Sequence, residues 1–499
     1  MTNEVFLTAR QAWGEWAGLR ARRDRFKRFV YGDQWSDPVT LPDGRTVSEY
    51  EAMASSGAHP LTNNLLRQIV KTVVGRYRTD VAAEERGDVL AGIASMNSLD
   101  ELDARALEEF LISGCAIQRI VAEKRAEGNG VWVDNVAPDR FFVNSFTDPR
   151  GYDIELVGML HDMSLGEVLI RFGGGNRRRE KRLAAIYSES ALTGGFLTSC
   201  GCEDFDVAAR ADRCRVVEVW TLDSVELLAC HDRRAARLVL ADASERDRVE
   251  SINARRRRLG QPTIAVQRRR SVRWRGSWFA PDGTLLATQL SPYSHGSHPF
   301  CVKLYPLIDG EVHPFIEDIV DQQRNINRSI TLIDHILGTS AKGALLYPME
   351  SLPRGVELND VAAMFSRPGA VIPVSQTRTQ TMPQLLSTSA NPAAAQLLRI
   401  EMEMMEKVSG VSSALQGQNV EGLGGSARLY AAQAENAAAA LRDIFDTFTS
   451  FRTSRNAKAL ASAINKPKGG GVDKRRKEPS AKGEKTGLTD SPAKKHDEC

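Results

Sequence analysis

The feature that most constrains this chain is an apolar seam along residues 314–338. Seven residues recur at alternating spacings of three and four: Ile316, Ile319, Gln323, Ile326, Ile330, Ile333 and Leu337. Because an α-helix turns once every 3.6 residues, this spacing predicts one helix of about 37 Å with a narrow apolar stripe, interrupted by a glutamine. Its other faces carry charged and amide side chains, which are typical of solvent-facing surfaces. We expect the helix to lie against a few neighbouring helices or copies of itself, so the seam indicates an assembly.

Length and composition exclude several classes of protein. With 499 residues, 42% of them hydrophobic, the chain is long enough for two to four globular units. No apolar run approaches the ~20 residues that span a bilayer, and residues 1–28 carry charges throughout, so we expect a soluble, intracellular protein without a membrane partner. The seven cysteines are odd in number and irregularly spaced, which indicates reduced thiols.

The charge is concentrated at the end of the chain. Residues 456–499 hold 11 Lys+Arg against 6 Asp+Glu, including the run Lys474, Arg475, Arg476 and Lys477. Large apolar residues are almost absent after Ile464, so we predict a disordered basic tail over 456–499. The preceding 455 residues are close to neutral.

Residues 1–310 contain both stretches with helical spacing and stretches typical of β-strands. Helical spacing predicts helices over 4–30, 63–78, 99–113 and 243–260, and β-branched and aromatic runs predict strands at 116–123, 130–135, 215–222 and 271–290. The intervening stretch 173–212 is predicted to be a loop. The pattern indicates an α+β body.

A different order follows the body. After the seam helix, residues 341–375 place four prolines around short apolar runs, which predicts a small strand-and-turn module. A second helix follows Pro392 and ends at Gly410, with apolar residues at Leu397, Leu398, Met402, Met405 and Val408. A polar loop over 411–425 and a third helix from 426 to about 455 complete the sequence helix, module, helix, loop, helix.

No catalytic signature is present. The chain lacks Gly-x-x-x-x-Gly-Lys-Ser/Thr, His-Glu-x-x-His and Gly-x-Ser-x-Gly motifs. The acidic patch Glu317, Asp318 and Asp321 has metal-ligand spacing, but Arg324 and Arg328 one turn later explain it more simply as ion pairs between subunits or along the helix. We therefore expect no metal, no cofactor and no enzymatic activity.

Several short motifs, in their order along the chain, carry a family resemblance. They are Tyr-Gly-Asp-Gln-Trp at 31–35, the helix 63–78, Pro-Asp-Arg-Phe-Phe-Val at 138–143, His-Pro-Phe at 298–300, Pro-Phe at 314–315, Asp-Gln-Gln-Arg-Asn-Ile-Asn at 321–327, Ser-Gly-Val at 409–411 and Ser-Ala-Arg at 426–428. With the helix–module–helix–loop–helix order, the chain resembles the portal proteins of tailed double-stranded-DNA bacteriophages. These form the ring at one capsid vertex through which the genome is packaged and ejected.

The resemblance implies a list of parts. It assigns 1–310 to a wing, 311–340 and 391–409 to two stem helices, 341–390 to a clip, 410–425 to a tunnel loop and 426–455 to a long helix toward the crown, before the tail 456–499. A large crown is not expected, because the chain passes directly into the tail. The seven seam residues would form the subunit interface of the stem, so we expect Ile326→Asp to disrupt assembly more than folding.

The resemblance also implies partners. The chain would form a dodecameric ring, pass double-stranded DNA without reading its sequence, and contact the terminase large subunit, a head–tail adaptor, and the major capsid and scaffolding proteins. It would reside at the portal vertex of the virion, and in the host cytoplasm during assembly. The alternative is a nucleic-acid enzyme or coiled-coil DNA-binding protein that uses the acidic helix patch or the arginine runs at 177–179 and 255–258.

Two segments are predicted to meet DNA. In the tunnel loop, Gln416, Gln418, Asn419 and Glu421 provide polar groups without any Arg or Lys, which suits a surface that DNA slides past. In the tail, Lys474, Arg475, Arg476 and Lys477 would bind phosphates. We expect DNA binding to be weak, independent of sequence and carried mostly by the tail.

Overall fold

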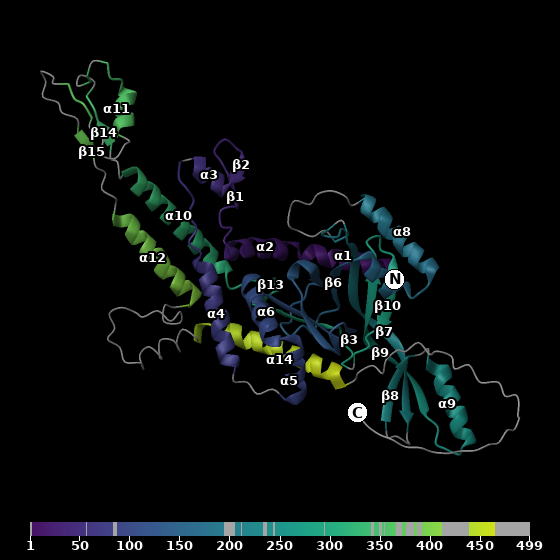
Figure 1. Ribbon diagram of the computed structural model, residues 1–499. Helices are drawn as coiled ribbons and strands as arrows, with labels where there is room; N and C mark the ends of the chain where they lie inside the picture. Colours follow the sequence, from purple (N-terminus) through teal and green to yellow (C-terminus); the bar gives the residue numbers. More distant parts are fainter. Residues whose placement is uncertain are drawn as a thin grey trace, which may run out of the picture. The chain divides into compact units, whose positions relative to one another are not determined.

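The computed structural model describes residues 2–55, 57–82, 87–193, 205–210, 212–232, 237–242, 245–293, 295–340, 344–348, 352–353, 355–365, 372–375, 384–386, 392–411 and 439–464 (Figure 1). All of them fall within one compact unit, Met1–Asn465. Helices and antiparallel sheets both contribute, which confirms the α+β prediction. None of the described helices is long and apolar enough to cross a membrane.

The N-terminal third is mainly helical. The predicted helix 4–30 is two helices, α1 (Thr2–Glu15) and α2 (Ala17–Tyr31), and α2 ends at Gly32, whose φ of 103° favours glycine. A small lobe follows with β1 (Pro38–Thr40), β2 (Thr46–Ser48) and α3 (Glu49–Ser55). Then come α4 (Leu65–Val81), α5 (Asp88–Asn97) and α6 (Leu99–Ser113). The predicted helices 63–78 and 99–113 are thus confirmed.

Two antiparallel sheets form the β part of the body. In the smaller sheet, β3 (Cys115–Arg125) lies between β4 (Gly128–Asn135) and β11 (Phe300–Leu304). In the larger sheet the order is β10 (Leu285–Leu290), β9 (Ala265–Phe279), β7 (Cys214–Asp232), β6 (Leu156–Met163) and β5 (Phe141–Val143), and β8 (Arg237–Asp242) also pairs with β7. A two-stranded ribbon joins β12 (Leu307–Ile308) to β13 (Glu311–Val312). The predicted strands are confirmed, although β7 and β9 are longer than expected.

Helices inserted among these strands include one that was not expected. The stretch 173–212, predicted to be a loop, contains α8 (Arg177–Thr193). Leu183 and Tyr187, four residues apart, are both buried, and this short apolar stripe among charged residues holds the helix on the body. Before it, α7 (Leu165–Val168) continues into a π-helical turn, Leu169–Gly173, and α9 (Arg246–Arg258) confirms the helix predicted over 243–260.

The C-terminal part follows the predicted order of elements. The seam forms α10 (Glu317–Ser340), and α12 (Pro392–Ser409) packs against it and ends at Gly410. Between them β14 (Ala344–Leu346) pairs with β15 (Gln384–Leu386), and α11 (Leu358–Phe365) is a helix where only strands and turns were predicted.

The last helix, α14 (Arg442–Ile464), packs on β3, β4 and β11. It continues nine residues beyond the predicted end at 455, so the predicted tail boundary at 456 is wrong. The added turns are rich in alanine, a strong helix former, and Ala459 is fully buried in the body's core.

Candidate functional site

The first half of α10 is fixed to the body by side-chain amides. Gln323 is fully buried, and its Oε1 accepts hydrogen bonds from the backbone N–H groups of Leu65 (3.1 Å) and Leu66 (3.0 Å), which open α4. Its Nε2 donates to the carbonyl of Asn63 (2.6 Å) and to Oδ1 of Asn327 (3.0 Å). All four hydrogen-bonding positions of the glutamine side chain are therefore used.

The same pattern continues along the helix at intervals of four residues. Asn327 Oδ1 accepts from the Asn63 N–H (3.1 Å), its Nδ2 donates to Gln34 Oε1 (2.5 Å), and Thr331 Oγ1 accepts from the Leu61 N–H (3.0 Å). Asn327 was predicted to face solvent, but it and Thr331 are each only 1% exposed. We call Gln323, Asn327 and Thr331 the polar ladder. It lies against the chain segment 61–66, which has no regular structure before α4 and whose backbone groups need partners.

Three motifs that lie far apart in the sequence meet at this ladder. Gln34 belongs to the aromatic turn 31–35, Asn63 precedes α4, and Asn327 lies on α10. Trp35 also donates its indole N–H to Thr62 Oγ1 (3.0 Å), and Asn64 caps α4 while donating to the carbonyl of Val30 (2.9 Å). The motifs that carry the family resemblance therefore include the residues that hold α10 in place.

Charge reinforces the attachment from the lobe that contains α3. The buried carboxylate of Glu49 accepts from Arg324 Nη2 (3.0 Å) and from Arg328 Nε (2.5 Å). These arginines were expected to pair with the acidic patch, yet the only such contact among the described residues is Arg324 to Asp321 at 3.9 Å. In the patch, Glu317 lies within 3.5 Å of Arg22 in α2. Arg324 and Arg328 thus serve mainly to bind α10 to its own chain.

The seam consequently divides into two halves. Ile316, Ile319 and Ile326 are at most 1% exposed and belong to the core of this chain together with Gln323, so they have no surface left for a second subunit. Assigning these four residues to a subunit interface is therefore wrong. Ile330 and Ile333 are partly buried and Leu337 is 51% exposed, so an interface role for these three stays a prediction.

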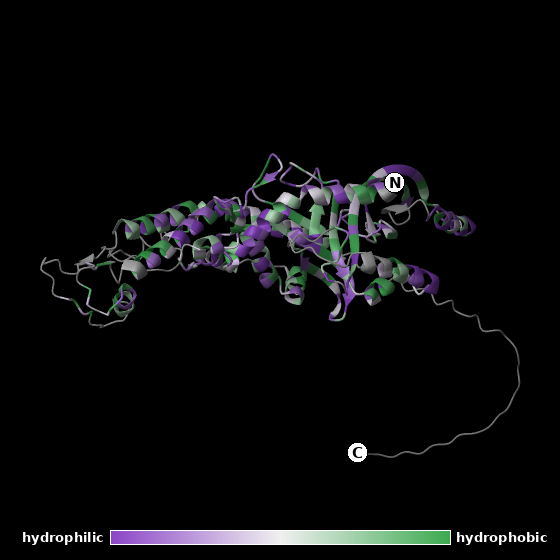
Figure 2. Ribbon diagram, turned by 90° about the horizontal axis from the view of Figure 1, so that it is seen from above, coloured by the Kyte–Doolittle hydropathy of each residue, from purple (hydrophilic) through white to green (hydrophobic). Residues whose placement is uncertain are grey.

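Helix α12 has a buried face and an exposed apolar face. Met405 and Ser409 are buried and Leu398 packs against the core, which accounts for the contact with α10. Along an adjacent face the spacing of three and four leaves a stripe 42–53% exposed: Leu397, Ile400, Met404 and Val408. Figure 2 shows hydrophobic and hydrophilic segments alternating along both helices. We call these four residues the α12 stripe.

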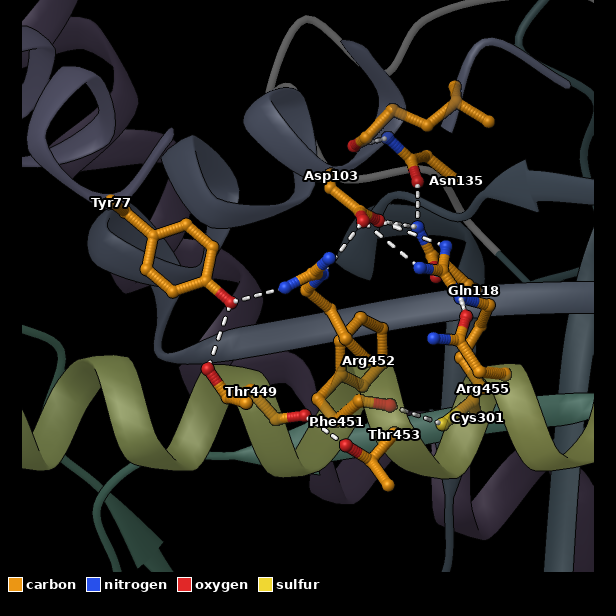
Figure 3. Close-up of polar contacts among 12 residues, drawn as sticks. Tyr77, Asp103, Gln118, Asn135, Cys301, Thr449, Phe451, Arg452, Thr453 and Arg455 are labelled. Atoms are coloured by element: carbon orange, nitrogen blue, oxygen red, sulfur yellow. Dashed lines mark hydrogen bonds and ion pairs between the residues drawn. The ribbon is translucent and has the colours of Figure 1, made fainter. Parts of the chain in front are cut away.

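The helix α14 is attached by a buried ionic network (Figure 3). Asp103 on α6 accepts from Arg452 Nε (3.0 Å), from Arg455 Nη1 (3.0 Å) and from Arg455 Nη2 (3.0 Å). Arg455 also donates to Gln118 on β3 (3.3 Å), and Arg452 donates to the Tyr77 hydroxyl on α4 (3.2 Å). One carboxylate therefore joins α14 to α6, and its two arginines extend the link to β3 and α4.

Toward its end α14 also places a lysine against the sheet. Lys458 Nζ donates to the carbonyls of Phe300 (2.5 Å) and His298 (3.3 Å), and burial lowers the pKa of this lysine. Burial, with repulsion from Lys458 and His295, also holds the pKa of His298 well below its usual value. No group of three metal-ligating side chains converges among the residues the structure describes.

A second buried ionic cluster lies in the larger sheet. Burial by itself would raise the pKa of Glu218, but Arg119 and the hydrogen bonds from His161 (2.6 Å) and Trp220 (2.8 Å) outweigh it and hold that pKa far below its usual range. The carboxylate has no exposed surface. Because it is ionised, satisfied and closed to solvent, it serves the packing of β3, β6 and β7.

The remaining predicted site residues lie outside the described part of the chain. This applies to Gln416, Gln418, Asn419 and Glu421 in the predicted tunnel loop and to Lys474, Arg475, Arg476 and Lys477 in the tail. Sequence reasoning missed the polar ladder and Asp103. The glutamine that interrupts the seam was the available signal for the ladder.

Comparison with known proteins agrees with the family resemblance found in the sequence. The family model described as phage P22-like portal protein matches residues 7–467, which include every described element from α2 to α14. No curated protein matches the chain. Proteins of this portal family are structural and not enzymes, which confirms the prediction that the chain is no enzyme. The chain belongs to the phage P22-like portal protein family.

Proposed function

We propose that the chain is the repeating subunit of a dodecameric ring at one capsid vertex, through which double-stranded DNA is packaged and later ejected. In this proposal residues 1–310 form the wing, α10 and α12 form the stem, residues 341–390 form the clip, and the loop 410–425 faces the DNA. The helix α14 runs along the body toward the crown end. Family membership supports a phage portal, and the copy number of twelve comes from the resemblance alone.

The observation that carries the ring is the α12 stripe. Four apolar side chains on one helix remain 42–53% exposed in the single subunit, although the same helix is anchored through its other face. Fully burying a side chain of this size contributes about 1.5–3 kcal/mol, so covering the stripe would stabilise an assembly appreciably. On α10, Ile333 is partly buried and Leu337, one turn later on the same face, is 51% exposed, and together they offer a complementary apolar surface.

The two surfaces predict the symmetry of the assembly. The stripe lies on α12, and its proposed partner surface lies on α10 of the next copy. A contact between different surfaces of two copies is head to tail, and repeating it closes into a ring when the rotation divides a full turn. The anchored half of α10 would hold each stem at a fixed angle to its body, which a closed ring requires.

The proposed partners follow from the parts. The clip would receive the terminase large subunit during packaging and a head–tail adaptor afterwards, and the wing would meet the major capsid and scaffolding proteins. Assembly would take place in the host cytoplasm, and the finished ring would remain in the virion.

Electron microscopy of the purified full-length chain tests the proposal. We expect rings with an axial hole, and averaged end views should give twelvefold symmetry. Monomers, two-fold dimers or open filaments at micromolar concentration would contradict the ring, and a closed ring of another order would correct the copy number alone.

A further inference from the structure

The part of the larger sheet that carries α9 is strongly basic. We call residues 223–275 the basic arm; it holds the second half of β7, β8, α9 and most of β9 (Figure 1). Its sequence contains 14 arginines and no lysine, against 7 Asp+Glu. The near-neutral charge of the chain as a whole conceals this local excess.

Most acidic side chains of the arm are already paired with an arginine. Asp232 accepts two hydrogen bonds from Arg256 (2.8 and 2.7 Å), and Asp223 accepts one from Arg275 (2.7 Å). The further pairs are Glu250 with Arg246 (2.9 Å), Glu245 with Arg248 (3.6 Å) and Glu226 with Arg268 (3.9 Å). The excess positive charge therefore belongs to the other arginines.

Two groups of arginines in the arm are left without a partner. Arg255, Arg257 and Arg258 in the last turn of α9 are exposed, and so are Arg269 and Arg270 on β9. None of these five side chains forms a hydrogen bond or an ion pair in the described part of the chain. Holding like charges close together without counterions is unfavourable, so such a surface favours a polyanion.

The arm holds these arginines on a rigid support. Asn253 of α9 donates to the carbonyl of Ile264 (2.9 Å) and accepts from its N–H (2.7 Å), which fixes the turn between α9 and β9. Val249 packs with Leu228 and Cys230 of β7 and closes the helix onto the sheet. The end of α9, with Arg255, Arg257 and Arg258, and the start of β9 are thereby kept next to each other, and Arg269 and Arg270 follow further along β9.

We propose that the basic arm binds the phosphate backbone of double-stranded DNA, through residues other than those of the predicted tunnel loop and tail. A guanidinium matches two phosphate oxygens at once, and arginine is the only cation the arm uses. That this duplex is the phage genome rests on the proposed function, because the genome passes through a portal ring.

The composition of the arm favours duplex DNA over other polyanions as its ligand. Trp274 is the only Phe, Tyr or Trp in the arm and it is buried, so the arm offers no exposed platform for stacking the bases of a single strand. The same absence removes the aromatic anchors on which protein interfaces usually depend, which weighs against an acidic protein as the partner. Contacts to phosphate alone carry no sequence information, so two duplexes of unrelated sequence should bind equally.

The test measures binding of the full-length chain to fluorescent 30-base-pair duplexes over a range of KCl concentrations. The variant Arg255→Gln/Arg257→Gln/Arg258→Gln should raise Kd by about tenfold or more, and should flatten the dependence of log K on log[KCl] by about 0.9 for each phosphate that the variant no longer neutralises. Arg269→Gln/Arg270→Gln should act in the same direction. Unfolding curves should be nearly unchanged, because these side chains have no described partner.

The matched control removes three charges elsewhere. Arg177, Arg178 and Arg182 on α8 are equally exposed and form no described ion pair, so Arg177→Gln/Arg178→Gln/Arg182→Gln should change Kd by less than about twofold. An equally large rise in Kd for the control and for the arm variants would overturn the inference, as would arm variants that bind like the wild type. Weaker binding to polyglutamate with unchanged duplex binding would also overturn it and assign the arm to an acidic protein.

Electron microscopy of the same samples separates this inference from the proposed function. If the wild type and the arm variants all form rings and bind the duplex equally, only the inference is contradicted. Arm-dependent duplex binding by a chain that forms no ring would support the inference and contradict the proposed function.

Discussion

At Gln323 the apolar stripe of α10 is interrupted by an amide whose four hydrogen-bonding positions all have partners in the same chain. Apolar contacts alone would allow α10 to slide or rotate by small amounts. Hydrogen bonds to the backbone at 63–66 fix its position, because a displaced helix would leave buried N–H and carbonyl groups without partners. The polar ladder therefore specifies the position of α10 more than it adds to stability.

Gln323→Leu tests the ladder. The substitution leaves the buried N–H of Leu66 without its acceptor, at about 1–3 kcal/mol. The Leu65 N–H and the Asn63 carbonyl keep their bond to each other, and Asn327 Oδ1 keeps the N–H of Asn63. We expect the free energy of unfolding, measured in urea, to fall by about 1–3 kcal/mol. Asn325→Leu, on an exposed position of the same helix, should change it by less than about 0.5 kcal/mol. Similar decreases for both variants would show that the ladder has no special role.

Asp103→Asn tests the attachment of α14. The change removes the only carboxylate that contacts Arg455 among the described residues, and Arg455 is 1% exposed. Leaving this buried charge uncompensated costs about 3–5 kcal/mol, so α14 should detach before the body unfolds. Limited proteolysis should then cut within 442–464. Glu101→Gln, an exposed change on the same helix, should leave the cleavage pattern as in the wild type.

The histidines beside Lys458 predict a pH dependence. Burial lowers the pKa of His295 to about 4 and holds that of His298 well below its usual value, whereas both return to about 6.5 on unfolding. The unfolded chain therefore binds more protons below about pH 6.5. Stability should be level above that pH and should fall as the pH drops toward 4.

His298→Asn measures the contribution of one of these two histidines. The asparagine Oδ1 can replace the ring Nδ1, which accepts from the Phe300 N–H (3.2 Å), while the titrating group disappears. In urea unfolding between pH 4.5 and 8, the slope of stability against pH should become shallower by up to about 1.4 kcal/mol per pH unit. His59→Asn, at an exposed site, should leave the slope as it is. An unchanged slope in His298→Asn would mean that this ring takes up its proton over the same pH range in the folded and the unfolded chain.

At the scale of elements, α10 and α12 have different tasks. The first half of α10 is buried in its own body, whereas the α12 stripe is exposed. A charge should therefore disrupt folding at Ile326 and assembly at Ile400, which reverses the expectation drawn from the seam alone.

Ile400→Glu tests this division. The side chain is 53% exposed in one subunit, so the urea midpoint of the dissociated chain should barely change, while analytical ultracentrifugation should show subunits in place of rings. Ile326→Asp should lower the stability of the subunit itself by several kcal/mol. Glu406→Gln, an exposed polar position on α12, should keep both properties. Intact rings from Ile400→Glu would remove the α12 stripe from the interface.

The sequence predicted elements better than contacts. The bounds of α6, α10 and α12 follow from strong apolar periodicity and from glycines that end α6 and α12, signals that act within a few residues. It missed α8, where only two of the side chains that the structure describes are buried, among many charges, and the end of α14, where alanines form a helix supported by the sheet beneath. The contact between Gln34 and Asn327 joins residues 293 positions apart, and no local pattern encodes it.

At the scale of the whole molecule, charge is unevenly distributed along the chain. Residues 466–499 carry 10 Lys+Arg and 6 Asp+Glu, the basic arm has an excess of seven positive charges, and the rest of the chain is acidic overall. Two basic segments in a chain whose remainder is acidic should bind DNA at the arm and the tail, while the remainder repels it. DNA binding would then have two contributions, one from the arm and one from the tail, whereas the sequence alone predicted that the tail carries most of it.

A truncation separates the two contributions, and the structure decides where to cut. Ending the chain at 455 would remove Ala459, which is fully buried, and Lys458, whose Nζ donates to the carbonyls of His298 and Phe300, and would disturb α14 itself. Residues 1–465 keep the whole helix. We expect this truncation and Arg255→Gln/Arg257→Gln/Arg258→Gln each to flatten the salt dependence of duplex binding, with effects on log K that add in the combined variant, because each set of basic residues releases its own counterions. Binding that disappears with the tail alone would assign DNA binding to the tail, and binding unaffected by its removal would assign it to the arm.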